Sequence, residues 1–212
     1  TTFKYEIPYM LLITAVLLVM GMTGNEITFI EGVILWILFI AYLLYLYFLA
    51  KKGNDSGDEQ SVKLYPVWKC LLFIVLGGVC VVIGSQLVVN GATTIARACG
   101  MSERFIGLTI VAFGTSLPEL VTSVSAARKG NAGIAIGNIV GSNIFNILFV
   151  IGTVALICPV PFESRFVIDT VVAILCGVLL WGGTIRHKEL RKPCGVVMLL
   201  CYAAYFVYLA AM

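Results

Sequence analysis

The sequence predicts an all-α protein that is integral to a membrane and crosses it about seven times. Of the 212 residues, 60% are hydrophobic and 12% are charged, whereas a soluble domain is about half apolar and about a quarter charged. The mean hydropathy is +1.04. Apolar stretches of about 20 residues, which are long enough to cross a bilayer as a helix, recur along the chain. We therefore expect a lipid bilayer around the protein and no nucleic-acid partner.

Seven segments are apolar enough to be transmembrane helices. The third is longer than a bilayer requires, so we expect it to tilt or to extend beyond the bilayer. The only long polar stretch has the composition of a flexible loop and separates a two-helix piece from a five-helix piece. The predicted spans are 8–23, 30–49, 68–96, 105–127, 132–157, 166–185 and 194–212, and the pieces are 1–50, the loop 51–66 and 67–212.

Basic residues are distributed unevenly between the two predicted sides of the membrane. Only Arg97, Arg104 and Arg165 fall on one side, and the other side carries the remaining eleven of the 14. The richer side is cytoplasmic by the positive-inside rule, which places the N-terminus inside the cell. Its residues are Lys4, Lys51, Lys52, Lys63, Lys69, Arg128, Lys129, Arg186, Lys188, Arg191 and Lys192. The acidic residues on the opposite side, Glu26, Glu31, Glu103, Glu163 and Asp169, are expected to be solvated.

The residue patterns of enzymes and of resident cofactors are missing from the sequence. The seven cysteines lack a CxxC spacing and are best interpreted as small hydrophobic side chains. His187 is the single histidine, so it has no partners for a zinc site. There is no nucleophile–base set and no phosphate-binding loop. We therefore expect neither an enzyme nor a bound cofactor.

One carboxylate, Glu119, lies in the middle of a predicted span. A charge at that depth costs roughly 2.5–3.5 kcal/mol on insertion scales, so such a residue is usually functional. Thr115 and Ser116 precede it by four and three residues, which places both on its face of a helix. Pro118 lacks an N–H and clashes with the carbonyl four residues earlier, so the helix should kink or break between Gly114 and Pro118.

A broken helix exposes backbone carbonyls that need partners in lipid, here those of residues 112–115, beginning with Ala112. The next span adds a polar stripe, because Asn138, Ser142 and Asn146 recur every four residues. Carbonyl, hydroxyl, amide and carboxylate oxygens together suit a hard cation such as sodium or calcium. One carboxylate carries too little charge for a dehydrated divalent ion, so a second one is expected from elsewhere.

Two other interpretations of these polar residues remain open. A stripe of asparagine and serine can simply hydrogen-bond one membrane helix to another. Glu119 could instead relay protons, since a buried carboxyl group can be neutral at pH 7.

Four motifs in this region resemble one family closely. GTSLPEL at 114–120 and GNIVGSNIFNI at 137–147, with GSQLVVNGA at 84–92 and GLTIVAFG at 107–114, resemble the alpha-repeat of the sodium/calcium exchanger superfamily of calcium:cation antiporters. The resemblance covers 84–157. Such proteins have ten helices in two inverted five-helix halves, each with one repeat, and bind ions on discontinuous helices where the repeats meet.

The resemblance implies that this chain, which shows one repeat, corresponds to helices 4–10 of the ten. It implies antiport of calcium against sodium, with the first-repeat half or a second copy of the chain as partner. Proton-driven calcium exchange and an inactive fragment are the alternatives. The short 51–66 loop favours the plasma (inner) membrane of a microbe. The implied ligands are Ala112 through its carbonyl, Thr115, Ser116, Glu119, Ser142 and Asn146, with Asn143 close by, and the polar stripe adds Asn138.

Overall fold

The computed structural model describes residues 2–53, 66–101, 103–185 and 190–211, which are almost entirely helical. Most of the predicted loop 51–66 and the residues Lys63, Arg186, His187 and Lys188 lie outside the described residues. The elements are η1 (Thr2–Glu6), α1 (Ile7–Gly24), β1 (Glu26–Ile27), α2 (Phe29–Gly53), α3 (Val67–Ala98), α4 (Glu103–Ile106), η2 (Gly107–Val111), α5 (Ala112–Thr115), α6 (Leu117–Arg128), α7 (Ala132–Phe145), η3 (Asn146–Ile151), α8 (Gly152–Ile157), β2 (Val160–Pro161), α9 (Ser164–Thr184) and α10 (Lys192–Ala211).

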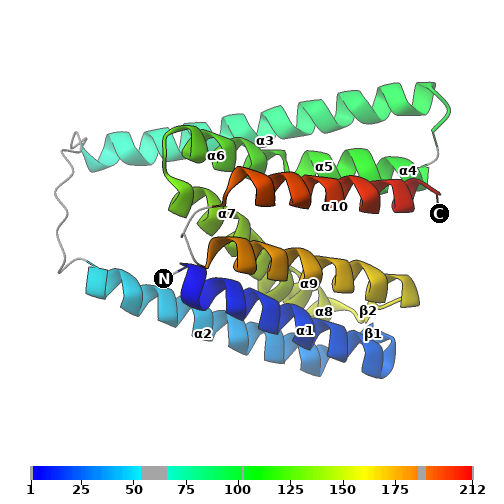
Figure 1. The fold of residues 1–212 in the computed structure, drawn as a ribbon, viewed down its shortest axis with the longest axis horizontal. Helices are drawn as coiled ribbons and strands as arrows, with labels where there is room; N and C mark the ends of the chain where they lie inside the picture. Colours follow the sequence, from blue (N-terminus) through cyan, green and yellow to red (C-terminus); the bar gives the residue numbers. More distant parts are fainter. Residues whose placement is uncertain (1, 54–65, 102, 186–189, 212) are drawn as a thin grey trace.

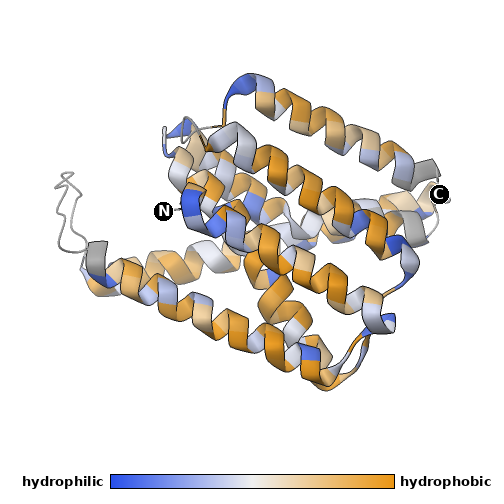
Figure 2. Cartoon of the chain, turned by 60° about the horizontal axis from the view of Figure 1, so that its bottom comes forward, coloured by the Kyte–Doolittle hydropathy of each residue, from blue (hydrophilic) through white to orange (hydrophobic). Residues whose placement is uncertain are grey.

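The helices confirm a multi-pass integral membrane protein. Among the described residues, five helices are long and apolar enough to cross a bilayer, and a bent pair of helices at 109–128 makes a sixth span. The segment predicted as the seventh span is α10, whose apolar part Lys192–Tyr208 is shorter. The five long spans are Thr2–Gly24, Phe29–Lys51, Val67–Ala98, Ala132–Ile157 and Ser164–Thr184. Apolar residues lie on all sides of most helices, and polar ones gather toward their ends (Figure 2).

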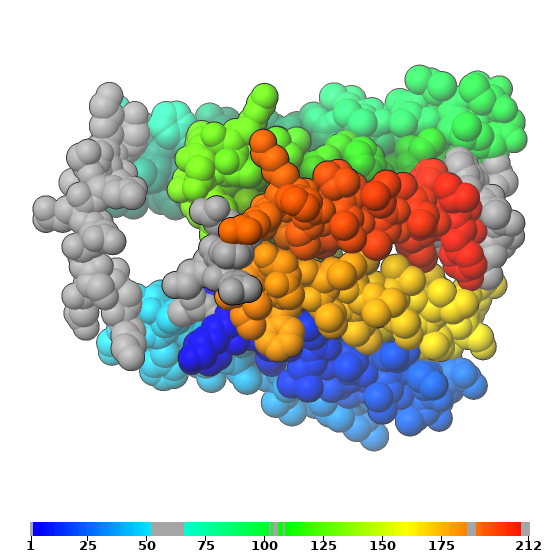
Figure 3. Space-filling model, in the orientation of Figure 1, coloured from blue at the N-terminus to red at the C-terminus, as the bar shows by residue number. Residues whose placement is uncertain are grey.

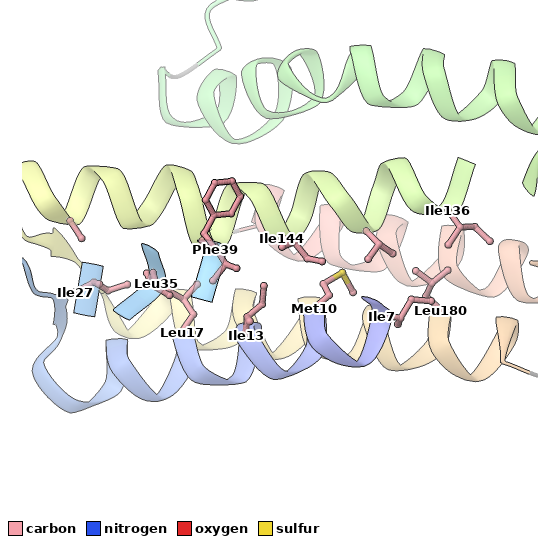
Figure 4. Close-up of a cluster of buried hydrophobic side chains, with 13 residues drawn as sticks. Ile7, Met10, Ile13, Leu17, Ile27, Leu35, Phe39, Ile136, Ile144 and Leu180 are labelled. Atoms are coloured by element: carbon pink, nitrogen blue, oxygen red, sulfur yellow. The ribbon is translucent and has the colours of Figure 1, made fainter. Parts of the chain in front are cut away.

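The tightly packed part of the molecule consists of α1, α2, α7, η3, α8 and α9 (Figure 1). Helix α1 buries Ile7, Met10, Ile13 and Leu17, which are spaced as one face of a helix. These side chains meet α7 at residues such as Ile144, as Figure 4 shows. Helix α10 lies between α9 and the α4–α6 segment on the face in Figure 3. The predicted site residues on α7 and η3 therefore belong to a well-packed helical body.

Two chain reversals at one end of this body are joined by a short antiparallel ribbon. In the ribbon Glu26 pairs with Pro161 and Ile27 pairs with Val160. The backbone N–H of Phe162 also donates to the carbonyl of Asn25 at 2.8 Å. The ribbon links the α1–α2 turn to the α8–α9 turn.

Helix α3 is packed very differently from the helices of the core. It has 32 residues, about 48 Å at 1.5 Å per residue, and so exceeds a bilayer core of about 30 Å, as its sequence predicts. Of its residues only Thr93 and Ala96 are buried. It contacts α4, η2, α5 and α6, where Ser85 Oγ donates to the Gly114 carbonyl at 2.8 Å. Most of its apolar surface is free to contact lipid or further protein.

The helix ends that carry the predicted cytoplasmic basic residues lie at one end of the molecule. Figure 1 shows the start of α1, the end of α2, the start of α3, the α6–α7 turn, the end of α9 and the start of α10 at this end. The arrangement agrees with the alternation of loops inferred from charge. The described basic residues there are Lys4, Lys51, Lys52, Lys69, Arg128, Lys129, Arg191 and Lys192.

Candidate ion-binding site

The predicted break in the fourth span is present. Helix α5 ends at Thr115 and α6 begins at Leu117, and the two segments meet at 49°. Ser116 lies between them with φ −92° and ψ 0°. Pro118 is in the first turn of α6, where its missing N–H has no intrahelical partner to lose. The break therefore follows from the local rule that predicted it.

A cavity of about 440 Å³ lies beside this break. One wall comes from the α5–α6 segment and the other from α7 and the first residue of η3. Six of the eight predicted site residues line it, together with Leu120, Ser123 and Ile139. The six are Thr115, Ser116, Glu119, Ser142, Asn143 and Asn146.

Within this cavity the carboxylate of Glu119 lacks a complete set of partners. Its Oε2 atom is buried and, among the described residues, has no hydrogen-bond partner. A buried charged oxygen without a partner is strongly disfavoured. A cation in the cavity would remove this penalty.

The neutral oxygens around Glu119 are arranged to accept rather than to donate. Thr115 Oγ1 donates to the Ala112 carbonyl at 3.0 Å, and Ser142 Oγ donates to the Ile139 carbonyl at 3.0 Å. The Asn143 amide nitrogen donates to the same Ile139 carbonyl at 2.8 Å. Because these donors point back to the helices, the lone pairs of the hydroxyls and of the amide oxygen stay available for a cation.

Ala112 and Asn138 are the predicted site residues that do not line the cavity. The Ala112 carbonyl accepts the Thr115 hydroxyl. The Asn138 amide nitrogen donates to the Glu119 carbonyl at 3.2 Å and to Ser123 Oγ at 3.0 Å. Asn138 therefore ties α7 to α6 directly at Glu119, and its role as a ligand stays a prediction, as does that of Ala112.

Two serines at this site were not identified from the sequence. Ser123 lines the cavity and donates to the Ala135 carbonyl at 3.3 Å. It follows Glu119 by four residues, so helical spacing was a sufficient signal. Ser85 holds α3 against the broken helix through Gly114, and no local spacing indicates this contact.

Wide π-helical turns flank both walls of the cavity. Turn η2 directly precedes α5, and turn η3 begins at Asn146. Such turns occur frequently at functional sites, where they redirect a helix and free backbone groups. Sequence periodicity did not indicate them.

The described residues hold no group of three or more histidine, cysteine, aspartate or glutamate side chains that could bind a metal. At the cavity the acidic contribution is Glu119 alone. The residues fit a weakly charged cation site built from one carboxylate and neutral oxygens.

Comparison with known proteins assigns the chain to a family. The family described as sodium/calcium exchanger protein matches residues 69–211. The putative antiporter CaxA from Alkalimonas amylolytica is 35% identical, over 96% of this chain and 67% of its own length. The sodium/calcium exchanger MaX1 from Methanosarcina acetivorans is 38% identical, over 66% of this chain and 41% of its own.

A solved structure agrees with the sequence comparison. The sodium/calcium exchanger from Methanococcus jannaschii superposes with a TM-score of 0.75 at 31% identity, over 95% of this chain and 63% of that one. The chain thus spans about two thirds of the length of these relatives, or less. By sequence and by fold, the chain belongs to the sodium/calcium exchanger family.

Proposed function

We propose that this chain is part of a secondary antiporter that exchanges calcium for sodium across a membrane by alternating access, with both ions binding at Glu119. The observation that carries the proposal is the buried Glu119 Oε2, which has no hydrogen-bond partner among the described residues and lies in a cavity whose lining includes hydroxyl and amide side chains. The family of the chain and the names of its relatives support transport rather than catalysis.

Competition for one carboxylate explains how the two fluxes are coupled. Sodium and calcium both prefer oxygen ligands, and both need the Glu119 charge. The two ions therefore cannot load together, and each transport step carries one or the other. Asn138 acts as a positioning residue, because it fixes the backbone of Glu119 against α7.

Calcium requires more carboxylate ligands than the described residues provide at this cavity. The ion takes six to eight oxygen ligands and favours several carboxylates, whereas Glu119 is the acidic residue of the cavity. We assign 67–212 to one five-helix half with its repeat at 84–157, and 1–50 to the end of the other half. The first-repeat half, or a second copy, supplies the other carboxylate. The short 51–66 loop favours a microbial plasma membrane.

Radioactive calcium uptake into vesicles that contain the chain tests the proposal. We expect uptake driven by an outward sodium gradient, lost in Glu119→Gln and retained in Asp169→Asn, which changes another carboxylate within a span. Uptake that persists in Glu119→Gln would overturn the assignment. Uptake that ignores sodium and collapses when a pH gradient is dissipated would instead show proton-driven exchange.

If the wild-type chain alone shows no calcium uptake, the experiment is repeated with an added segment that bears the first repeat. Restored uptake that again depends on Glu119 supports the proposed division into halves. The absence of calcium uptake with both repeats present would refute this division.

A further inference from the structure

A second cavity lies between η1 with the first turn of α1 and the second half of α2. The N-terminal turn that contributes to it is at the end of the molecule where most of the basic helix ends lie (Figure 1). Its volume is about 320 Å³. Four tyrosines, Tyr5, Tyr9, Tyr42 and Tyr45, line it with Glu6 and two aliphatic residues of α2. None of these residues belongs to the cavity at Glu119.

Glu6 is a mostly buried residue beside these tyrosines. It is 8% exposed and takes part in neither ion pair of the described residues. It precedes α1 directly, yet its side chain makes no capping hydrogen bond. Its carboxylate is therefore available to a cation that enters the cavity.

The tyrosines offer aromatic faces and one unsatisfied hydroxyl. Tyr9 stacks on Tyr42 with ring centroids 5.4 Å apart, and Tyr42 stacks on Tyr45 at 6.3 Å. Tyr9 Oη donates to the Leu38 carbonyl at 2.9 Å, but Tyr45 Oη is buried without a partner. Lys4 Nζ lies over the Tyr5 ring, 5.5 Å from its centre, so one ring of this cluster already contacts an ammonium group.

The chemistry of this cavity suits an organic cation better than a metal ion. A bare calcium ion needs six or more oxygen ligands, and these walls are mostly aromatic and aliphatic carbon. An alkylammonium group is attracted by ring faces and by a carboxylate, and its carbon atoms tolerate apolar walls. We propose that this cavity is a binding site for an alkylammonium group, with Glu6 as its counter-ion.

Two sources could present this group. Tyrosines at helix ends commonly lie at the headgroup level of a bilayer, so a phospholipid with an ammonium headgroup could reach the cavity from the membrane. A small soluble cation such as choline could reach it from water. The two sources share the ammonium group that Glu6 and the rings recognise.

Native mass spectrometry of the purified chain in detergent tests the site. With phosphatidylethanolamine and phosphatidylglycerol supplied equally, we expect preferential retention of phosphatidylethanolamine. Glu6→Gln should lower that preference about ten-fold, which corresponds to the loss of one desolvated cation interaction. Tyr42→Leu should lower it as well, whereas Tyr42→Phe, which keeps the ring, should not.

Controls separate binding from folding and one source from the other. Glu26→Gln makes the same charge change at an exposed position of β1, beyond the far end of α1, and should leave the preference intact. A thermal shift on adding choline chloride in lipid-free detergent, with the sodium concentration held constant, assigns the soluble source. A shift with phosphatidylethanolamine alone assigns the lipid. No shift with either ligand, or an unchanged lipid preference in folded Glu6→Gln, would overturn the proposal.

Discussion

Replacing Glu119 by glutamine should leave the ion-free protein at least as stable as the wild type. The substitution keeps the shape of the side chain but removes the charge on Oε2, which is buried without a hydrogen-bond partner. An unsatisfied buried group costs about 1–3 kcal/mol, and more if it is charged. For a chain of this size, each 1 kcal/mol corresponds to about 2–4 °C in the unfolding temperature. We expect a rise of several degrees in the presence of a chelator and the absence of sodium.

Asp169 provides a matched comparison, because it is a carboxylate within α9 that has a partner. Its Oδ1 accepts the Tyr205 hydroxyl at 2.7 Å, and the residue is half-buried rather than fully solvated as predicted. A hydrogen bond to a charged group contributes about 1.5–3 kcal/mol. Asp169→Asn should therefore lower the unfolding temperature by a few degrees.

Added ions should make the unfolding temperature of the wild type higher than that of Glu119→Gln, which reverses the order expected without ions. A ligand present at 100 times its dissociation constant stabilises the folded state by about 2.7 kcal/mol. Calcium or sodium should raise the unfolding temperature of the wild type and of Asp169→Asn, but not that of Glu119→Gln. Tryptophan fluorescence during heating in detergent measures all three proteins. If ion-free Glu119→Gln unfolds as far below the wild type as Asp169→Asn does, the reasoning is refuted.

Three further substitutions test other contacts. Asn138→Ala removes two hydrogen bonds that join α7 to α6 and should cost about 1–3 kcal/mol, with slower calcium uptake. Gly32→Ala should destabilise the protein by about 1–3 kcal/mol, because the new Cβ would lie 2.9 Å from that of Ala155. The unfolding temperature measures this loss. Arg97→Gln should raise the pKa of Glu103, which its hydrogen bond to Arg97 holds below the usual value, and an NMR titration measures this. The pair contributes stability above the unfolded pKa of Glu103 and loses it as pH falls through the lowered folded value.

Each of these three has an outcome that contradicts it. Gly24→Ala adds a Cβ that meets nothing within 4 Å, so equal losses at Gly24 and Gly32 would exclude the packing argument. Unchanged uptake in Asn138→Ala would show that its hydrogen bonds do not position Glu119. An unchanged Glu103 titration in Arg97→Gln would show that the ion pair does not form in solution.

The bend beside the cavity, which the sequence predicted, depends on a local rule. A proline after the first turn of a helix breaks or kinks that helix. Pro118 lies in the middle of a predicted span, so the bend at Ser116 was predictable. Thr115 and Glu119 are four residues apart and both line the cavity, although the break at Ser116 places them on separate helices. Six of the eight residues expected as ligands line the cavity, and their role in ion binding stays a prediction.

Tertiary contacts explain what the sequence did not reveal. At 3.6 residues per turn, a stripe with a period of four drifts by about 40° at each step. Asn138 therefore faces α6, while Ser142 and Asn146 face the cavity. Glu6 likewise lies before the predicted start of the first span, where the sequence does not indicate burial. In the structure η1 packs on α7, and Trp181 Nε1 donates to the Phe3 carbonyl at 3.2 Å. These contacts hold the turn that contains Glu6 against the protein.

The ribbon between β1 and β2 has a mechanical consequence. It joins the α1–α2 hairpin to the α8–α9 hairpin through backbone hydrogen bonds, and Phe162 adds one more to Asn25. A change in the tilt of α1 would therefore be transmitted to α9. We expect the two hairpins to move as one unit about this end of the molecule. Helices α3 and α6 take no part in this ribbon, so the wall that holds Glu119 is joined to this body through α7 instead.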